Sequence, residues 1–142
     1  MKISTKGRYA LRMLIDLAEH QSSGYVALKD IATRQNISKK YLEQIVPILN
    51  GANILKTNRG FQGGYMLSQS PDKYAVGEIL RLTEGSLCPV DYSEDSEGSS
   101  GETAMLPVWK ELDRLINSYL DSVTLQDLLD RLQESYANDY II

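Results

Sequence analysis

Apolar side chains recur at helical spacing through the first third of the chain. In segment 5–19 they stand at i, i+3 and i+4, which places them on one buried face of a helix. The residues on that face are Ala10, Leu11, Leu14, Leu17 and Ala18. Segments 28–35 and 39–52 show the same spacing with shorter apolar faces, so the pattern predicts three helices in this region.

Polar and special residues stand where the ends of these helices are expected. Ser4 or Thr5 can cap the first helix, and Ser38 can cap the third. Asn53 can adopt the left-handed conformation that ends the third helix. Pro47 lies inside that helix and has no backbone N–H to donate, which predicts a kink or a tightening of the last turns.

A glycine-rich loop separates the next two apolar segments. Residues 54–59 and 65–69 predict two short strands, and the loop 60–64 supplies the glycines that a hairpin needs. Segment 76–84 predicts a fourth helix. Helices followed by a hairpin are the order of a winged helix-turn-helix domain, and we assign residues 1–85 to it.

The remainder of the chain predicts a linker and two helices. Residues 86–105 are acidic, rich in small side chains and without apolar periodicity, so we expect a mobile linker. Segment 106–120 is strongly amphipathic, and segment 125–132 predicts a last helix that Thr124 and Asp127 can cap. The long helix presents one apolar row, Trp109, Leu112, Ile116 and Leu120, with Val108, Leu115 and Tyr119 beside it. The fold class is therefore mainly α with a small β-hairpin.

Charge is distributed unevenly between the two parts of the chain, although the net charge is only −4. Residues 1–81 hold twelve basic and six acidic side chains, a net charge of +6, and residues 82–142 hold three basic and thirteen acidic ones, a net charge of −10. This asymmetry favours a polyanion-binding module beside a part that does not bind polyanions. Ordinary solvated surface charge is the alternative.

Composition argues against several other classes of protein. The one cysteine, Cys88, cannot form an internal disulfide framework, and a reducing cytoplasm is the expected location. No apolar run is long enough to cross a membrane, and residues 1–9 contain no signal-peptide core. We find no phosphate loop, no metal-spaced ligand set and no nucleophile near the lone His20, so we expect neither an enzyme nor a bound metal or cofactor.

The polar start of the third helix fits a recognition helix in the DNA major groove. Ser38, Lys39 and Lys40 stand at its N-terminus, where free amides and cations favour phosphate. Gln44 can read adenine through paired hydrogen bonds, and Glu43 can accept a hydrogen bond from cytosine. The alternatives are plain solvated charge for the lysines and local helix contacts for Glu43 and Gln44.

Three further residues extend this candidate DNA surface. Tyr41 shares a helix face with Gln44, although it can also be half core. Arg59, at a strand end, suits a phosphate or the minor groove. Phe61, at the loop tip, could act as a minor-groove wedge, but packing back onto the hairpin is the favoured interpretation.

Five segments in their order resemble the Rrf2 family of bacterial regulators: MKISTKGRYAL (1–11), ISKKYLEQI (37–45), RGFQGGYML (59–67), VGEILRLTEG (76–85) and VTLQDL (123–128). The resemblance covers nearly the whole chain. It implies a homodimer in which the helix 106–120, within the helical region 106–142, is the dimerisation element. The residues that it places on DNA are Lys2, Thr5, Arg8, Ser38, Lys40, Tyr41, Glu43, Gln44, Arg59, Gly63 and Gly64. The dimerisation residues are Trp109, Leu112, Leu115, Ile116, Tyr119 and Leu120.

The single cysteine separates this chain from the cluster-binding members of the family. Those members carry three cysteines between the fourth helix and the dimerisation helix, whereas this chain has only Cys88 there. Thiolates are the usual iron–sulfur ligands, and two Cys88 side chains in a dimer fall short of four. We therefore expect a regulator without a cluster. Cys88 is then a small packed residue, which is the favoured interpretation, or a redox switch.

Within the family, the chain is most similar to the repressors of cysteine metabolism, at its start, at Tyr-Leu-Glu-Gln and at its aromatic–isoleucine ending. That resemblance implies cysteine synthase as a protein partner. The resulting hypothesis is a cytoplasmic homodimer that binds an imperfect palindrome in double-stranded DNA and represses genes of cysteine and sulfur metabolism. The alternatives are a redox- or iron–sulfur-responsive regulator that uses Cys88, and a winged-helix protein-interaction module.

Overall fold

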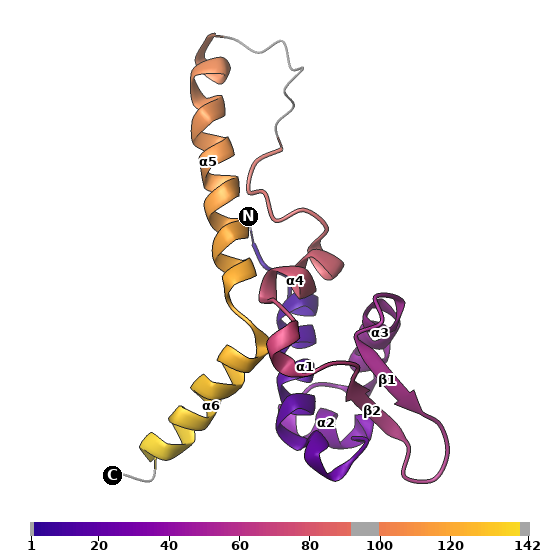
Figure 1. Cartoon of the computed structure of the whole chain (residues 1–142). Helices are drawn as coiled ribbons and strands as arrows, with labels where there is room; N and C mark the ends of the chain where they lie inside the picture. Colours follow the sequence, from indigo (N-terminus) through magenta and orange to yellow (C-terminus); the bar gives the residue numbers. More distant parts are fainter. Residues whose placement is uncertain (1, 92–99, 140–142) are drawn as a thin grey trace.

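The computed structural model describes residues 2–91 and 100–139. Within these ranges the chain forms a mainly helical molecule with one two-stranded antiparallel hairpin (Figure 1). The main elements are α1 (Thr5–His20), α2 (Leu28–Gln35), α3 (Lys39–Gly51), β1 (Leu55–Asn58), β2 (Gly64–Leu67), α4 (Val76–Glu84), α5 (Ser100–Ser122) and α6 (Leu125–Asp139). Short 3₁₀ helices η1 (Gln21–Ser23) and η2 (Pro71–Lys73) follow α1 and β2. This order confirms the predicted winged helix-turn-helix with a long additional helix.

Helix α1 is the centre of the hydrophobic core. The fully buried apolar side chains of the main core come from five helices: Ala10, Met13, Leu14 and Leu17 of α1, Ile31 of α2, Leu42, Ile45 and Leu49 of α3, Ile79 of α4, and Leu125 of α6. Leu11 and Ala18 are partly buried against the same cluster, so the predicted apolar face of α1 is confirmed. Burial of each large aliphatic side chain contributes about 1.5–3 kcal/mol.

The helix ends follow the capping residues that the sequence offers. Ser4 Oγ accepts a hydrogen bond from the Gly7 N–H at 3.0 Å, so Ser4 caps α1. Ser38 Oγ accepts from the Tyr41 N–H at 3.1 Å and caps α3. Asn53 adopts the predicted left-handed conformation with φ of 60°. Helix α3 continues as one helix through the exposed Pro47.

The hairpin, or wing, pairs β1 with β2 in the register Leu55↔Leu67 to Asn58↔Gly64. Val26, before α2, adds an isolated bridge to Tyr65, with both backbone hydrogen bonds formed at 2.8 and 2.9 Å. A Cβ on Gly64 would collide with the Val26 carbonyl, because the two backbones approach so closely there. Glycine at position 64 is therefore explained by the attachment of the wing to the helical core.

The long helix differs from its prediction at the N-terminal end. Helix α5 begins at Ser100, so residues 100–105, which were predicted as linker, are helical and exposed. The sequence missed this extension because the apolar pattern begins only at Leu106. The core of the predicted linker, residues 92–99, lies outside the described residues. Helix α6 also extends further than predicted, to Asp139.

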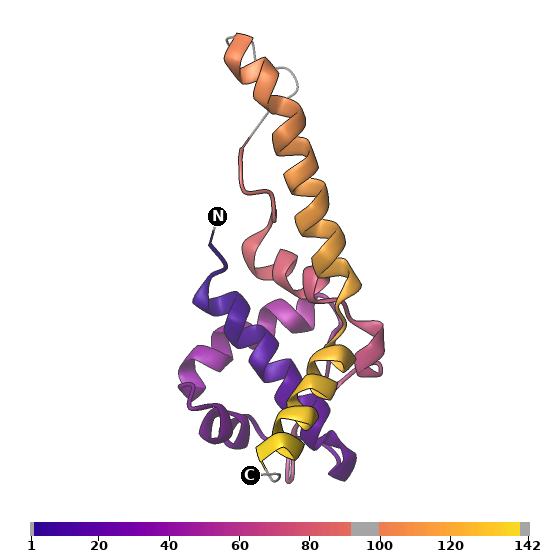
Figure 2. The ribbon, with the colours of Figure 1, turned by 90° about the vertical axis from the view of Figure 1, so that its left-hand side faces the viewer.

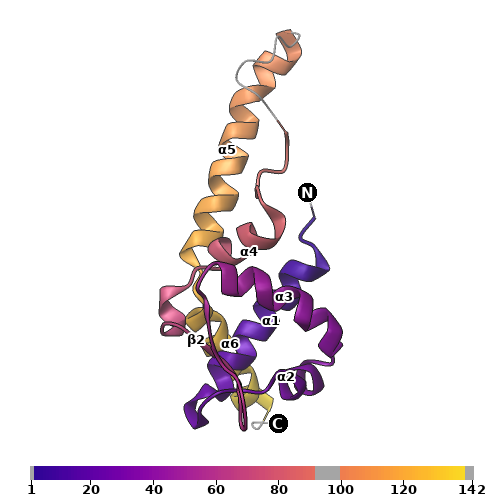
Figure 3. The ribbon, with the colours of Figure 1, turned by 90° about the vertical axis from the view of Figure 1, so that its right-hand side faces the viewer.

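Helix α5 rises away from the rest of the molecule, and α6 turns back across α1 (Figures 1, 2 and 3). A second apolar cluster fixes the base of α5: Val76, Leu80, Leu87 and Val123 are buried there, and Ile116 and Leu120 pack against them. At the junction of α5 and α6, Thr124 Oγ1 accepts from the Asp127 N–H at 3.1 Å and Asp127 accepts from the Thr124 N–H at 2.9 Å. This reciprocal pair is the predicted cap. No helix in the described ranges is long and apolar enough to span a membrane.

Candidate nucleic-acid interface

Helix α3 and the wing line one groove of about 520 Å³. The groove brings together Lys39 and Glu43 of the helix with Arg59, Gly63 and Gly64 of the wing, all of which the sequence proposed as DNA contacts. Asn50, Thr57 and Asn58 add amide and hydroxyl groups that sequence reasoning did not select. The groove therefore combines cations with donors and acceptors of hydrogen bonds, the chemistry that phosphates and base edges require.

The recognition-helix side chains are free to reach a ligand. Lys39, Lys40, Glu43 and Gln44 are exposed, and within the described residues none has a side-chain hydrogen-bond or ion-pair partner. The local helix contacts that were the alternative for Glu43 and Gln44 are thus absent from this structure. Ser38 is exposed but its hydroxyl is engaged in capping.

Tyr41 is half-buried, and its position explains how α3 is held on α1. Its ring meets that of Tyr9 edge-on, with the centroids 5.4 Å apart and the planes inclined by 70°. The guanidinium carbon of Arg12 lies 5.1 Å from the centroid of the Tyr9 ring, a cation–π contact. The half-core interpretation of Tyr41 is confirmed, and its ring also sets the position of the first turn of α3.

A buried charge network, which sequence reasoning missed, anchors the end of α2. Asp16 of α1 is fully buried, and its oxygens accept from Arg34 Nε at 3.0 Å and Nη2 at 2.7 Å, and from Gln35 Nε2 at 3.0 Å. The hydrogen bond to Asp16 raises the pKa of the Arg34 guanidinium. Arg12 completes the network through the Gln35 side chain and carbonyl. The signal in the sequence was a carboxylate at position 16 on the buried side of α1, next to Leu17.

The start of α1 is held by the end of α4. Glu84 accepts hydrogen bonds from the Ser4 N–H at 3.0 Å and from the Ser4 hydroxyl. A carboxylate there also complements the positive end of the α1 dipole. A Cβ on Gly7 would meet the side-chain oxygens of Glu84 and Thr83, so a larger residue there would have to displace these side chains. Lys2, Thr5 and Arg8 are exposed at this end of α1 but do not line the groove between α3 and the wing.

The prediction for Phe61 at the wing tip was wrong. Phe61 does not pack back onto the hairpin: its side chain is 95% exposed. The tip loop turns through Gly60, with φ of 118°, and Gln62, with φ of 59°. The Gly63 N–H closes it by donating to the Gly60 carbonyl at 2.9 Å. The short hairpin ends at Asn58, and the rest of the described chain covers almost none of the ring of Phe61.

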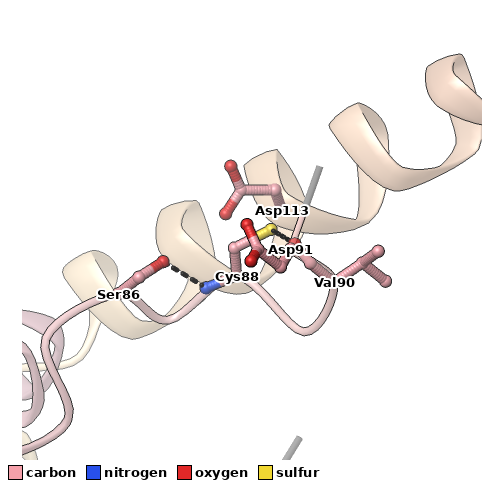
Figure 4. Close-up of a pocket in the computed structure, with 5 residues that line it drawn as sticks. All are labelled: Ser86, Cys88, Val90, Asp91 and Asp113. Carbon is pink, nitrogen blue, oxygen red and sulfur yellow. Dashed lines mark hydrogen bonds between the residues drawn. The ribbon is translucent and has the colours of Figure 1, made fainter. Parts of the chain in front are cut away.

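Cys88 lies between α4 and the flank of α5 (Figure 4). The thiol is half-buried, and its Sγ donates to the Val90 carbonyl at 2.9 Å, while the Cys88 N–H donates to Ser86 Oγ at 3.1 Å. The surrounding hollow of about 370 Å³ is lined by Ser86, Cys88, Val90, Asp91 and Asp113. In residues 2–91 and 100–139 no three His, Cys, Asp or Glu side chains are grouped to hold a metal ion.

The six candidate dimerisation residues divide between two environments. Ile116 and Leu120 pack against the cluster beneath α5 in their own chain, whereas Leu115 is 50% exposed and Tyr119 61% exposed. Trp109 and Leu112 are partly exposed. Val108, Leu112 and Leu115 line a shallow, largely apolar hollow of about 470 Å³ on α5, so the exposed apolar surface continues toward the free end of the helix.

An exposed polar recognition helix beside a cationic wing is the arrangement that helix-turn-helix transcriptional regulators use to bind DNA. The chain matches the Rrf2 family model, described as an iron-dependent transcriptional regulator, over residues 3–131. It belongs to the Rrf2 family of transcriptional regulators, and its relatives are named as regulators rather than enzymes.

Two regulators of this family are similar to the chain over most of their length. The regulator CymR of Bacillus subtilis (strain 168) is 42% identical over 139 residues, 96% of this chain and 97% of that protein. The regulator IscR of Aliivibrio salmonicida (strain LFI1238) is 38% identical over 131 residues, 91% of this chain and 77% of that protein.

Solved structures support the same relationship. The structure of CymR (YrzC), the global cysteine regulator of B. subtilis, matches with a TM-score of 0.80 and 40% identity over 92% of this chain and 98% of that chain. The IscR of T. potens matches with a TM-score of 0.77 and 41% identity over 95% of this chain and 90% of that chain.

Proposed function

We propose that this protein is a cytoplasmic homodimer that binds an imperfect palindrome in double-stranded DNA and represses genes of cysteine and sulfur metabolism. The observation that carries DNA binding is the groove shared by Lys39 and Glu43 of α3 and Arg59 of the wing. The similarity to CymR supports the cysteine-related role.

Each part of the surface takes a distinct role in the bound complex. The N-terminal turn of α3, with Ser38, Lys39 and Lys40, lies against the phosphates at the edge of the major groove. Glu43 and Gln44 face base edges, and Arg59 binds phosphate or the minor groove beside the site. Lys2, Thr5 and Arg8 extend the contacts with the DNA backbone at the start of α1. Gly63 and Gly64 act indirectly, because they keep the wing compact and attached to the core so that its backbone can face DNA.

The exposed apolar side of α5 supports the proposed dimerisation. Val108, Leu115 and Tyr119 are all at least half exposed, an arrangement that a second copy of α5 would cover. Trp109 and Leu112 border this surface, whereas Ile116 and Leu120 support it from beneath. Two recognition helices placed by such a dimer read half-sites about one helical turn apart.

The protein would work without an iron–sulfur cluster and with cysteine synthase as its protein partner. Cys88 is the only thiol, so even two copies supply half of the four ligands that a cluster usually takes. The cysteine synthase proposal rests on the resemblance to the repressors of cysteine metabolism. It is tested by calorimetric titration of the cysteine synthase of the same genome into the dimer, where saturable 1:1 binding supports it and no heat of binding contradicts it.

The IscR relatives and the iron-dependent description of the family model favour a second candidate, an iron–sulfur-responsive regulator. Anaerobically purified protein distinguishes the two. A colourless, iron-free dimer is the expected result, whereas visible absorption with bound iron and sulfide supports the second candidate.

DNA binding itself is tested by titrating salt against the affinity of the protein for its own promoter. Affinity should fall steeply with salt because bound cations displace counterions from the phosphates. Arg131→Ala, an exposed charge change on α6, serves as the control variant. Weak binding that does not depend on salt would favour the protein-interaction module instead.

A further inference from the structure

Phe61 is the most exposed large apolar side chain in the described part of the chain. Its side chain is 95% exposed, and the next is Tyr119 at 61%. It is also the only phenylalanine in the sequence. Exposure of a phenyl ring to water is unfavourable, and almost none of this ring is covered by its own chain, so nearly its whole surface is available to a partner.

The loop presents the ring in one direction. Gly60 and Gln62 both have positive φ, and the Gly63 N–H to Gly60 carbonyl hydrogen bond ties the two sides of the loop together. A Cβ on Gly63 would collide with the Asn58 and Gly60 carbonyls, so the loop is tightly folded around its glycines. Phe61 therefore stands on a small, closed turn rather than at the end of a long, loose loop.

The wing places this ring beside the proposed DNA groove. On one side of the loop, Arg59 and Gly63 line the groove with α3. On the other side, Phe61, Gln62 and Tyr25 line a second hollow of about 510 Å³. The two hollows share Asn58 and Gly63, so the ring stands across the wing tip from the surface that faces the recognition helix.

The charge of the wing favours a polyanion as the partner. Residues 44–71, which contain the end of α3 and the whole wing, hold Lys56 and Arg59 and no acidic residue. The one acidic side chain that lines the hollow beside Phe61 is Asp30 of α2. An apolar ring and an exposed arginine, two positions apart on one positively charged hairpin, are the residue types that proteins use in the DNA minor groove.

We propose that Phe61 is an apolar wedge that inserts between base pairs in the minor groove beside each half-site, and so selects sites with a flexible step there. This inference rests on the proposed DNA-binding function and adds a determinant of specificity to it. Pyrimidine–purine steps unstack most readily, so the protein should prefer them at the wing position although no side chain hydrogen-bonds to their bases. The inserted ring also kinks the duplex.

The test uses duplexes that the wild-type full-length protein selects from a random pool. Each selected duplex is compared with one in which the step under the wing is changed from pyrimidine–purine to purine–pyrimidine. Affinity, the end-to-end distance of dye-labelled duplex and the fluorescence of 2-aminopurine at the step are measured for wild type, Phe61→Ala and Phe61→Leu. Gln62→Asn is the matched control, since asparagine tolerates the left-handed conformation of the next loop position.

The wedge predicts a specific set of changes. Phe61→Ala should weaken binding to the selected duplex about tenfold, abolish the preference between the two steps, and remove the bend and the 2-aminopurine signal. Phe61→Leu should retain part of the affinity, the step preference, the bend and the fluorescence signal. In both variants the dependence of affinity on salt should be unchanged, because no charge is lost. Thermal unfolding should also be unchanged, since the ring buries almost no surface in the free protein.

Other outcomes overturn the proposal. If Phe61→Ala keeps the wild-type bend and step preference while Arg59→Ala loses affinity, the wedge is wrong and DNA binding stands. If the wild type binds no duplex in a salt-dependent manner, both the wedge and the proposed function fall. If Gln62→Asn causes the same losses as Phe61→Ala, the effect belongs to the loop conformation and the wedge is wrong.

Discussion

The buried carboxylate of Asp16 accepts two hydrogen bonds from the guanidinium of Arg34, at 3.0 and 2.7 Å, and so joins α1 to the end of α2. Asn36, which turns the chain from α2 toward α3 with φ of 53°, follows directly. The ion pair therefore holds the end of α2 on α1, close to the turn that leads into α3. An apolar pair could pack as well but would not fix the angle through directional hydrogen bonds.

Replacement of Arg34 by Ala should lower the free energy of unfolding by about 2–3 kcal/mol. The change leaves the carboxylate of Asp16 buried without its ion partner; the value lies below the usual loss for a fully buried pair because Arg34 is one-third exposed. Urea unfolding measures it. Lys73→Ala, which removes the exposed pair with Asp72, is the control and should change stability by less than about 0.5 kcal/mol. Equal effects of the two variants would contradict the structural role of Asp16.

The sequence predicted the parts of this fold that depend on local pattern. The apolar face of α1, the Ser38 cap and the Thr124–Asp127 cap all arise from residues close together in the chain. The Asp16–Arg34 pair and the collision of a Gly64 side chain with Val26 join distant segments, and periodicity carries no information about them. Phe61 was misjudged because apolar residues usually find a contact, whereas this hairpin is too short to offer one.

The sequence predicted part of the candidate interface. Lys39, Glu43 and Arg59 could be chosen from residue type and position, and the structure places them in one groove. Asn50 and Thr57 were missed because amide and hydroxyl side chains have many roles and no motif distinguishes those that face a groove. The sequence placed Ile116 and Leu115 in two neighbouring apolar rows of α5 and assigned both to the dimer. Only the packing against α4 shows that Ile116 and Leu120 are covered within one chain.

Replacement of Arg59 by Ala should weaken binding to all DNA sequences by a similar factor. Arg59 is exposed and lines the groove, and a cation on phosphate contributes affinity that does not depend on base sequence. The slope of log affinity against log salt should fall by about one. Fluorescence anisotropy on the promoter and on an unrelated duplex measures both effects, and a loss confined to the promoter would assign Arg59 to base readout instead.

Replacement of Gln44 by Ala should weaken binding to the specific site and leave binding to unrelated DNA almost unchanged. Its amide is exposed on α3 and has no partner among the described residues, so it is available to pair with a base edge. The specific site should lose about 1–3 kcal/mol, with relaxed base choice at one position and an unchanged salt slope. Selection from a random duplex pool reports the base choice. Equal loss on specific and unrelated DNA would remove this role from Gln44.

Tyr74 makes the stability of the fold sensitive to alkaline pH. The residue is 3% exposed, and burial raises the pKa of its phenol. A raised pKa in the folded state means that the neutral phenol stabilises the fold at lower pH, and that this contribution is lost as pH rises from about 10 through the folded pKa. In Tyr74→Phe the alkaline decline of the free energy of unfolding should be shallower. Chemical unfolding at a series of pH values measures it, and identical alkaline limbs would contradict the assignment.

Leu115 and Ile116 should separate dimerisation from folding, because they face different surroundings on α5. Leu115 is 50% exposed and lines the apolar hollow, whereas Ile116 packs against the buried cluster of Val76 and Leu80. Leu115→Glu should give a folded monomer with unchanged helical content, because a charge at the proposed interface opposes its own copy across the two-fold axis. Ile116→Ala should instead lower the free energy of unfolding by about 2 kcal/mol, since it opens a cavity within one chain.

Sedimentation equilibrium gives the mass of each variant, and urea unfolding gives its stability. In the monomer produced by Leu115→Glu, affinity for a single half-site should be retained while affinity for the full palindrome falls, because the second recognition helix is no longer tethered at one helical turn. A Leu115→Glu protein that remains a dimer would place the interface on another face of the molecule. A monomeric Ile116→Ala protein with wild-type stability would reverse the assignment of the two faces.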